Sequence, residues 1–181
     1  MRQHSDEHEG SSDSGVAAGD ALAARLIELD PTGGQTWSEA QTKVHQALHR
    51  HAHDQALLAD PAWLDWLSTM AAHPSRAVRA IAVSALGTAG DPARQPIIVN
   101  ALSAPAPCVV AHAVKDLTAR SVDDVFDQLV DILNQTGNGV VWGSRHAAQR
   151  IAESSHPRRL DVLAHDWDTW NKASHTTSPR H

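Results

Sequence analysis

The sequence predicts an all-α protein built from stacked helix pairs, and three observations support that prediction. Apolar residues recur at helical spacing between residues 20 and 170, and no stretch alternates apolar and polar residues as a strand does. The 181-residue chain contains 30 Ala, no Tyr and one Phe, so a strong helix former is abundant while two residue types that favour strands are nearly missing. The helix boundaries also repeat about every 31 residues.

The two ends of the chain are predicted to be disordered tails, over residues 1–19 and 171–181. Residues 1–20 carry five acids and one Arg, and Val16 is their only large aliphatic residue. Such a segment cannot bury enough apolar surface to offset the entropy lost on ordering. Residues 171–181 are polar, contain Pro179 and show no periodicity. The folded domain is therefore expected to span residues 20–170.

Two kinds of start signal divide this domain into helices: a capping box, and an N-cap Asp followed by Pro at the first helical position. The capping boxes are Ser38 with Gln41 and Ser121 with Asp124, and the Asp-Pro pairs are Asp60-Pro61 and Asp91-Pro92. The expected helices cover residues 20–29, 38–52, 61–72, 76–87, 92–102, 107–118, 122–134, 140–153 and 157–169.

A repeat relates successive helix pairs to one another. A shift of 31 residues carries Val78, Ala82 and Leu86 onto Val109, Ala113 and Leu117, and a shift of 34 carries Ala113 and Leu117 onto Ala147 and Ile151. Three helix pairs are therefore expected in register, with a looser pair over 38–52 and 61–72 before them. Because one pair cannot bury its apolar face alone, the pairs should stack into a solenoid.

The best-formed of these repeats resembles the HEAT repeat, in the short form shared with the phycobilisome-lyase-like repeats. It carries Val78-Arg79, Ala82, Ala85-Leu86-Gly87 and Gly90-Asp91-Pro92, although Gly143-Ser144 replaces Val-Arg in the last repeat. The resemblance covers about residues 75–170. It implies a right-handed α-solenoid of three to four helix pairs, whose concave face is lined by the second helix of each pair. It does not imply a bilin substrate, because fold alone does not assign function.

Composition excludes several classes of function. The net charge of -6, with only 3 Lys, disfavours nucleic-acid binding. The single Cys, Cys108, excludes a disulfide framework and a Cys-rich zinc site, and we expect it to be buried and inert. No apolar run is long enough to cross a membrane, and no secretory signal is present. These features favour a cytoplasmic protein without cofactor or metal, and the Ala- and Arg-rich, Lys-poor composition is typical of a high-GC bacterium.

The predicted helix over residues 122–134 carries the clearest candidate binding surface. Its apolar residues fall on one arc, while Asp123, Asp124, Asp127 and Asp131 fall on the other. In the repeat register this stripe lies on the second-helix side, where Asp124, Asp127 and Asp131 would dock a basic segment of a protein partner. The alternative is a solvated helix face on which Asp123 and Asp124 stabilise the helix N-terminus.

The six Trp residues form a second group of candidates. Trp63 and Trp66 lie three residues apart on one predicted helix and are expected in the core. Trp142, Trp167 and Trp170 are predicted partner-binding anchors, because partly exposed indoles are favoured at interfaces. The alternative for Trp167 and Trp170 is that they cap the end of the solenoid.

Histidines are also frequent, with 13 in the chain. His45, His49 and His53 recur at helical spacing, and a pair of His four residues apart can hold zinc. No Glu follows His45 as in metalloproteases and no Cys lies near, so we expect exposed histidines. Their protonation near pH 6 would make the binding of charged partners pH-sensitive.

Taken with the repeat, these residues favour a non-enzymatic protein-binding module, such as an adaptor, immunity or assembly factor, that holds a protein segment on its concave face. Two enzyme alternatives stay open. One is a lyase or chaperone for a small molecule, which would need a pocket lined by Trp and His. The other resembles the HEAT-like alkylpurine DNA glycosylases, with Trp63 and Asp65, or Trp167 and Asp168, in the groove, but the acidic balance argues against DNA.

Overall fold

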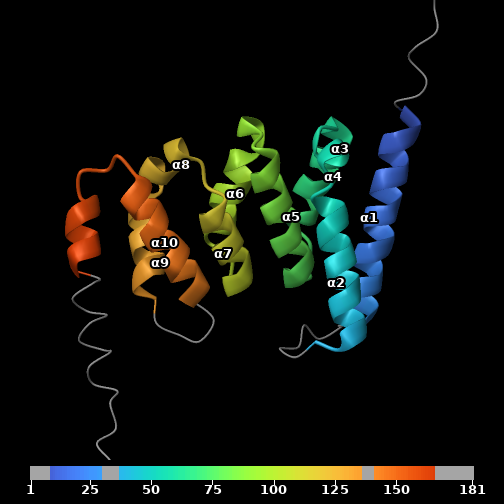
Figure 1. Cartoon of the computed structure of the whole chain (residues 1–181), viewed down its shortest axis with the longest axis horizontal. Helices are drawn as coiled ribbons and strands as arrows, with labels where there is room; N and C mark the ends of the chain where they lie inside the picture. The colour runs from blue at the N-terminus through green and yellow to red at the C-terminus, as the bar shows by residue number, and fades with distance from the viewer. Residues whose placement is uncertain (1–8, 30–36, 136–140, 166–181) are drawn as a thin grey trace, which may run out of the picture.

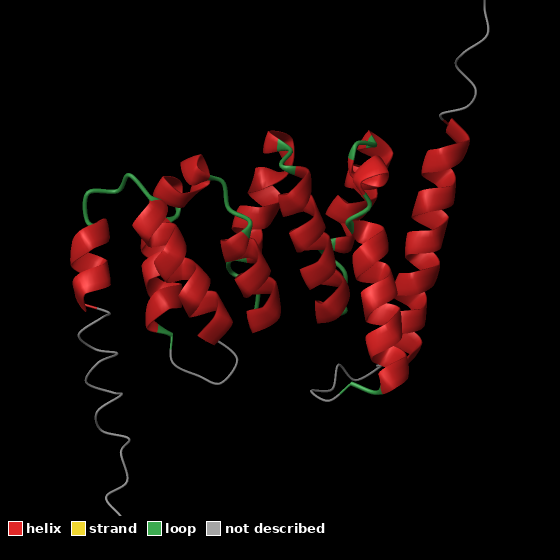
Figure 2. Ribbon diagram, viewed as in Figure 1, coloured by secondary structure: helices red, strands yellow, loops and turns green. Residues whose placement is uncertain are grey.

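The computed structural model describes residues 9–29, 37–135 and 141–165. These residues form helices joined by short turns, and no strand occurs among them (Figure 2). The elements are α1 (Glu9–Leu29), α2 (Glu39–Ala52), α3 (Gln55–Leu58), α4 (Pro61–Met70), α5 (Arg76–Ala89), the 3₁₀ turn η1 (Pro92–Arg94), α6 (Gln95–Ala101), α7 (Pro107–Lys115), α8 (Ala119–Asp124), α9 (Phe126–Asn134) and α10 (Val141–Glu153). A further helical segment covers residues 159–165.

The helices stand side by side in a row that runs from α1 to the helical segment 159–165 (Figure 1). The first helices of the successive pairs, α2, α5, α7 and α10, pack one against the next. The second helices α4, α6 and α9 each pack against the first helix that follows, α5, α7 and α10. The all-α solenoid predicted from the repeat is therefore confirmed.

The core follows the predicted repeat register. The repeat positions Val78, Ala82, Leu86, Val109, Ala113, Leu117, Ala147 and Ile151 are each at most 3% exposed. Trp63 is fully buried and Trp66 is 9% exposed, and their rings stack with centroids 4.3 Å apart. The prediction that Trp63 and Trp66 belong to the core is confirmed.

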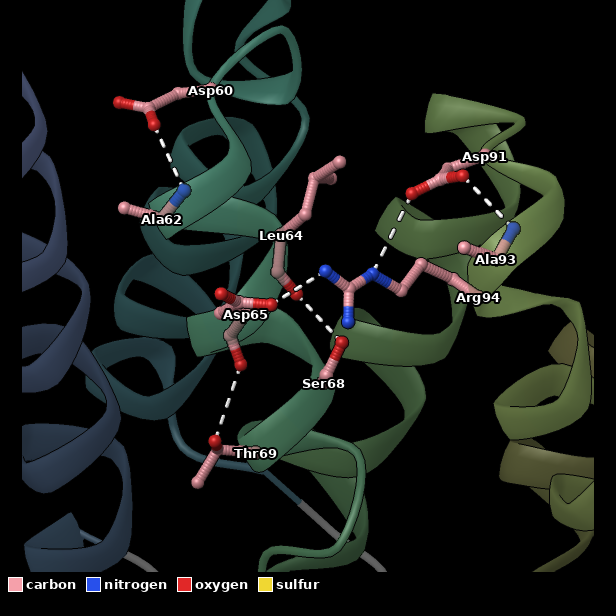
Figure 3. Close-up of polar contacts among 9 residues, drawn as sticks. All are labelled: Asp60, Ala62, Leu64, Asp65, Ser68, Thr69, Asp91, Ala93 and Arg94. Carbon is pink, nitrogen blue, oxygen red and sulfur yellow. Dashed lines mark hydrogen bonds and ion pairs between the residues drawn. The ribbon is translucent and has the colours of Figure 1, made fainter.

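The predicted Asp-Pro helix starts are also confirmed (Figure 3). The Oδ1 atoms of Asp60 and Asp91 each accept a hydrogen bond, at 2.9 Å, from the backbone N–H two residues later. Arg94 lies between two carboxylates, 2.5 Å from Asp65 on α4 and 3.5 Å from Asp91. This guanidinium ties the second helix of one pair to the next pair.

Similar polar links continue along the second helices. Gln128 Nε2 on α9 donates a hydrogen bond to Ser103 Oγ, at 2.9 Å, just after α6. Arg158 Nη1 lies 2.9 Å from Asp127 Oδ1, joining the last described turn to α9. Successive pairs are thus held together by apolar packing inside and by side-chain links at the surface.

The predicted start of the folded domain at residue 20 is too late, because α1 begins at Glu9. Gly15 and Gly19 are buried in this helix. A Cβ atom at Gly15 would lie 2.7 Å from Leu57, and one at Gly19 would lie 2.8 Å from the Trp66 ring, so the absent side chains permit close packing. Asp20 Oδ1 also accepts a hydrogen bond from Trp66 Nε1 at 2.7 Å. Counting large aliphatic residues misses a helix that packs through glycine.

Other expected boundaries differ in smaller ways. The expected helix 92–102 is divided into η1 and α6, and α3 was not anticipated. Residues 1–8 of the predicted tail 1–19, the predicted tail 171–181, and the part of the predicted helix 157–169 beyond residue 165 lie outside the described residues.

Candidate functional site

The predicted acidic stripe is present as an exposed surface on α8 and α9. We call Asp123, Asp124, Asp127 and Asp131 the acidic surface, and all four are exposed. The side chain of Asp127 is 81% exposed. Asp123, Asp124 and Asp131 make no hydrogen bond or ion pair with another described residue, whereas Asp127 pairs with Arg158.

This surface is not one continuous helical stripe, as the sequence predicted, because the chain breaks at Val125. That residue has φ -114° and ψ 20°, and its N–H bonds to the carbonyl O of Ser121 as α8 ends. The acids therefore lie on two short helices, with Asp124 at the end of α8 and Asp127 in the first turn of α9.

The predicted capping box of Ser121 with Asp124 is also wrong. Thr118 is the N-cap of α8, and its Oγ1 accepts from the N–H of Ser121 at 3.4 Å. The Ser121 hydroxyl is engaged instead by Thr118, at 2.9 Å, and by Gln95 Oε1, at 3.2 Å. Asp124 is consequently left free of a capping role and points its charge to solvent.

Among the described side chains, Arg158 forms an ion pair with the acidic surface. Its guanidinium lies 2.9 Å from Asp127 and 5.7 Å from the centre of the Phe126 ring. The Phe126 ring stacks in turn on His156, with centroids 3.8 Å apart. Because both partners of the ion pair are more than half exposed, the pair stabilises the fold by at most about 1 kcal/mol.

The predicted Trp anchors stay predictions. Trp167 and Trp170 lie outside the described residues, and the structure does not describe the side chain of Trp142 on α10. Trp63 and Trp66, the other closely spaced pair, are core residues.

A second polar group, which the sequence analysis found only in part, lies across the first helices. We call it the histidine face: His49 on α2 and His53 at the C-cap of that helix, His112 and Lys115 on α7, and His146 and Arg150 on α10. The rings of His49 and His53 stack with centroids 4.1 Å apart, and His45 with Trp37 continues the row along α2. The predicted stripe of His45, His49 and His53 is real, but these histidines are half-buried rather than exposed.

The floor of the histidine face is formed by α5 and the end of α7. His53 Nε2 lies 3.3 Å from Ser84 Oγ, and the carboxyl group of Asp116 also hydrogen-bonds the Ser84 side chain. Asp116 packs directly on Gly87, where any Cβ atom would overlap its side chain. Glycine at 87 therefore permits the close approach of α5 and α7 in this repeat. Arg150 spans to α7 by donating a hydrogen bond to the backbone carbonyl of Lys115.

Burial and nearby positive charges lower the pKa of three histidines of this face, His49, His112 and His146. Burial, and after it the charges of Lys115, His49, His53 and His146, together lower the pKa of His112 to about 4. Burial is also the main cause that lowers the pKa of His49 and of His146. Asp116 is shifted in the opposite direction, because burial raises its pKa against the pull of Lys115 and Arg150.

One signal in the sequence could have located this face. The 34-residue shift that relates the last two repeats carries His112 onto His146. Two histidines at the same repeat position on neighbouring first helices must project from the same side of the array. The first repeat has no histidine at the matching place, so the pattern covers only two of the three repeats.

The structure also bears on the pocket lined by Trp and His that a small-molecule enzyme would need. A cavity of about 80 Å³ lies between α7, α9 and α10, and its lining is Ala104, Pro105, Pro107, Val110, Ile132, Gln135 and Gly143. It holds neither Trp nor His and is far smaller than the roughly 300–1,000 Å³ typical of ligand pockets.

Cys108 is exposed, so the prediction that it is buried is wrong: it falls on the outward side of the first turn of α7.

The described His, Asp and Glu side chains do not form a metal site. Among the described residues, no group of three or more His, Cys, Asp or Glu is arranged to hold a metal ion. In the part of the chain that the structure describes, no helix is both long and apolar enough to cross a membrane.

Comparison with known proteins identifies one similarity. Residues 61–147, from the start of α4 into α10, match the family model described as HEAT repeats. HEAT repeats commonly mediate protein–protein interaction. No curated protein and no solved structure matches the chain.

Proposed function

The chain belongs to the HEAT-like repeat family, and on that premise we propose that it is a non-enzymatic protein-binding module. Its ligand is a basic segment of a partner protein, held on the acidic surface of α8 and α9. Adaptor, immunity or assembly roles all fit such a module, and the encounter takes place in the bacterial cytoplasm. A single cysteine, exposed on α7, suits a reducing compartment.

One observation carries this proposal: the acidic surface holds like charges close together, and three of its four carboxylates have no described ion-pair partner. Neighbouring carboxylates repel one another and create a negative potential over α8 and α9. A lysine- or arginine-rich segment would relieve that repulsion and would be attracted from a distance. Within the described part of the chain, these three side chains make no hydrogen bond or ion pair that would give them a structural role.

The framework beneath this surface favours docking without rearrangement. Phe126, Leu129, Ile132 and Leu133 anchor α9 in the core, each at most 7% exposed. Gln128 and Asp127 add the links to Ser103 and Arg158 described above. Most preformed interfaces move little on binding, and a rigid helix loses little entropy when it is covered.

Arg158 has a defined place in this proposal. In the free protein, Arg158 forms a weak, exposed ion pair with Asp127. A basic residue of the partner can displace it at small cost, so Arg158 acts as a surrogate for the partner's cation. Trp142, Trp167 and Trp170 remain proposed anchors for the same partner.

The test is a capture experiment with charge-matched variants. The tagged protein is incubated with lysate of its host at low and moderate salt, and the retained protein is then purified for direct binding. The binding variant carries Asp124→Lys, Asp127→Lys and Asp131→Lys. The control carries the same change of charge at exposed acids on α1 and α2, as Asp13→Lys, Glu28→Lys and Glu39→Lys.

We expect one partner that binds the wild type and the control but not the binding variant, with affinity that falls as salt rises. A partner bound equally by all three proteins would refute the role of the acidic surface and direct attention to the Trp residues. Failure to retain any partner at either salt concentration would count against the module itself.

A further inference from the structure

The first helices carry a surface whose chemistry is opposite to that of the acidic surface. The histidine face gathers four histidines, Lys115 and Arg150 from three helices, α2, α7 and α10. Lys115 is exposed, and the Arg150 side chain is 28% exposed. In a chain with only 15 Lys and Arg against 21 Asp and Glu, such a concentration of basic groups is unusual.

The carboxylates near this face offset only part of its positive charge. Asp116 lies beneath it, half-buried against Gly87 and bonded to Ser84. Glu153 lies at its edge. Its Oε2 atom forms an ion pair with Arg150 Nη1 at 2.8 Å, and its Oε1 atom accepts a hydrogen bond from Gln149 Nε2 at 2.9 Å. On α10, Arg145 adds a further positive charge beside His146. On α5, the residue that contacts the face is the uncharged Ser84.

The face is also recessed onto small side chains. On α5, Ala80 is 6% and Ser84 is 3% exposed, and the buried Ser84 contacts the His53 ring. His112 is half-buried, and its Nδ1 atom is buried without a hydrogen-bond partner in the described structure. Holding basic groups close together and partly out of water is unfavourable for the free protein. Clusters of this kind mark functional sites more often than ordinary surface.

We propose that the histidine face binds an extended, carboxylate-rich segment of a partner protein. Side-chain carboxylates accept hydrogen bonds from imidazole, ammonium and guanidinium groups, which together make up this face. Neighbouring packed helices lie about 8–10 Å apart, and a segment extended as polyproline II has three residues per turn and rises about 3.1 Å per residue, so residues three positions apart point the same way. Acidic residues three positions apart on the segment therefore reach α7 and α10 in turn.

A protein segment suits this face better than a nucleic acid does. Only Lys115, Arg145 and Arg150 are permanently charged here, which is few for tracking a phosphate backbone, and the net charge of the chain is -6. The proposal goes beyond the binding module proposed above, because it assigns a second surface and a ligand of opposite charge.

Binding at this face should strengthen as the pH falls. A bound carboxylate favours the protonated form of His49, His112 and His146, whose pKa values are lowered in the free protein, so binding takes up protons. Uptake of one proton would raise the affinity tenfold for each pH unit in the titrating range. Protonation of Asp116, whose pKa is raised by burial, removes a negative charge from the floor and acts in the same direction.

The test uses the full chain and a fluorescein-labelled 12-residue peptide with Glu at every third position. Fluorescence anisotropy at pH 7.5 and at pH 5.5 measures its affinity, and the Glu side chains stay mostly ionised over this range. A second peptide with Gln in place of Glu controls for charge. The binding variant is Lys115→Glu, and the matched control is Lys43→Glu, because Lys43 is an exposed residue of α2 that pairs only with Glu39.

We expect the wild type to bind the Glu peptide about tenfold more tightly at pH 5.5 than at pH 7.5. The Gln peptide should bind at least tenfold more weakly than the Glu peptide. Lys115→Glu should lower the affinity for the Glu peptide at least tenfold, whereas Lys43→Glu should not. His112→Gln, checked for folding by circular dichroism, should reduce the pH dependence. Equal binding of the two peptides, equal binding by Lys115→Glu and wild type, or no binding at either pH would overturn the proposal. The variants of Asp124, Asp127 and Asp131 should bind the Glu peptide at least as well as the wild type does, so a failure here is separate from a failure of the acidic surface.

Discussion

The acidic surface and the histidine face hold their charges in opposite ways. The acidic surface comes from one short stretch of sequence, and its carboxylates stand in solvent with little contact to the core. The histidine face is assembled from residues 49 to 150, and its rings lie half-buried over α5. A charge in solvent costs the fold little, whereas a titratable group that is withdrawn from water affects stability. Stability measurements should therefore separate the two surfaces.

The largest effect is expected at Gly87, beneath the histidine face. Gly87→Val places a side chain where Asp116 already packs, so α5 and α7 must separate. Overpacking of this kind costs about 1–3 kcal/mol, and we expect the upper end because the atoms overlap outright. Urea denaturation followed by circular dichroism measures the loss. Thr88→Val, at the exposed neighbouring position, is the control and should change stability by less than about 0.5 kcal/mol.

The next effect is a loss of stability in acid caused by the histidine face. Because the folded-state pKa of His112, about 4, lies below its ordinary value of 6.5, the unfolded chain binds the proton more readily. The contribution of His112 to the free energy of unfolding is therefore fully present above pH 6.5 and is lost as the pH falls toward 4. Partial exposure reduces the expected loss to about 2 kcal/mol. Urea midpoints at pH 7.5 and 4.5 should show this slope in the wild type and a smaller one in His112→Gln.

His49 and His146 act in the same direction, because their pKa values are also lowered. Asp116 acts oppositely, since its raised pKa makes protonation easier in the folded protein as the pH falls toward 4. An equal slope in wild type and His112→Gln would contradict the assignment of the acid sensitivity to the histidine face.

A smaller effect is expected from a carboxylate that has a structural role. Asp91→Ala removes the N-cap of η1 and one partner of Arg94 (Figure 3). Loss of such a cap costs about 1 kcal/mol. Asp91→Asn keeps a capping oxygen and should recover most of the loss. If Asp91→Asn were as unstable as Asp91→Ala, the ion pair rather than the cap would be responsible.

The smallest effect is expected on the acidic surface itself. Asp131→Ala removes an exposed carboxylate without an ion-pair partner among the described residues, so stability should change by less than about 0.5 kcal/mol. Relief of repulsion from Asp127 could even raise it slightly. A loss above 1 kcal/mol by urea denaturation would show that the acidic surface is structural and would weaken the proposed function.

Much of the fold could be predicted because its signals are local or periodic. The capping box of Ser38 with Gln41 and the Asp-Pro starts act within one turn of helix, and the structure contains each of them. The repeat of small and aliphatic residues predicted which positions face the core. The acids of α8 and α9 could be found for the same reason, although the break at Val125 could not, because it depends on Thr118 and Ser121 engaging Gln95 from another pair.

The sequence by itself determined that this chain forms stacked helix pairs and that four Asp residues near α9 would be exposed. Both follow from helical periodicity, which each stretch of sequence expresses without help from the rest. Only the tertiary structure decided that α1 extends back to Glu9 and that the histidines of α2, α7 and α10 form one face. The glycines of α1 are contacts only because Trp63, Trp66 and Leu57 lie opposite them. The altered pKa values of the histidines exist only because helices distant in the sequence remove their rings from water.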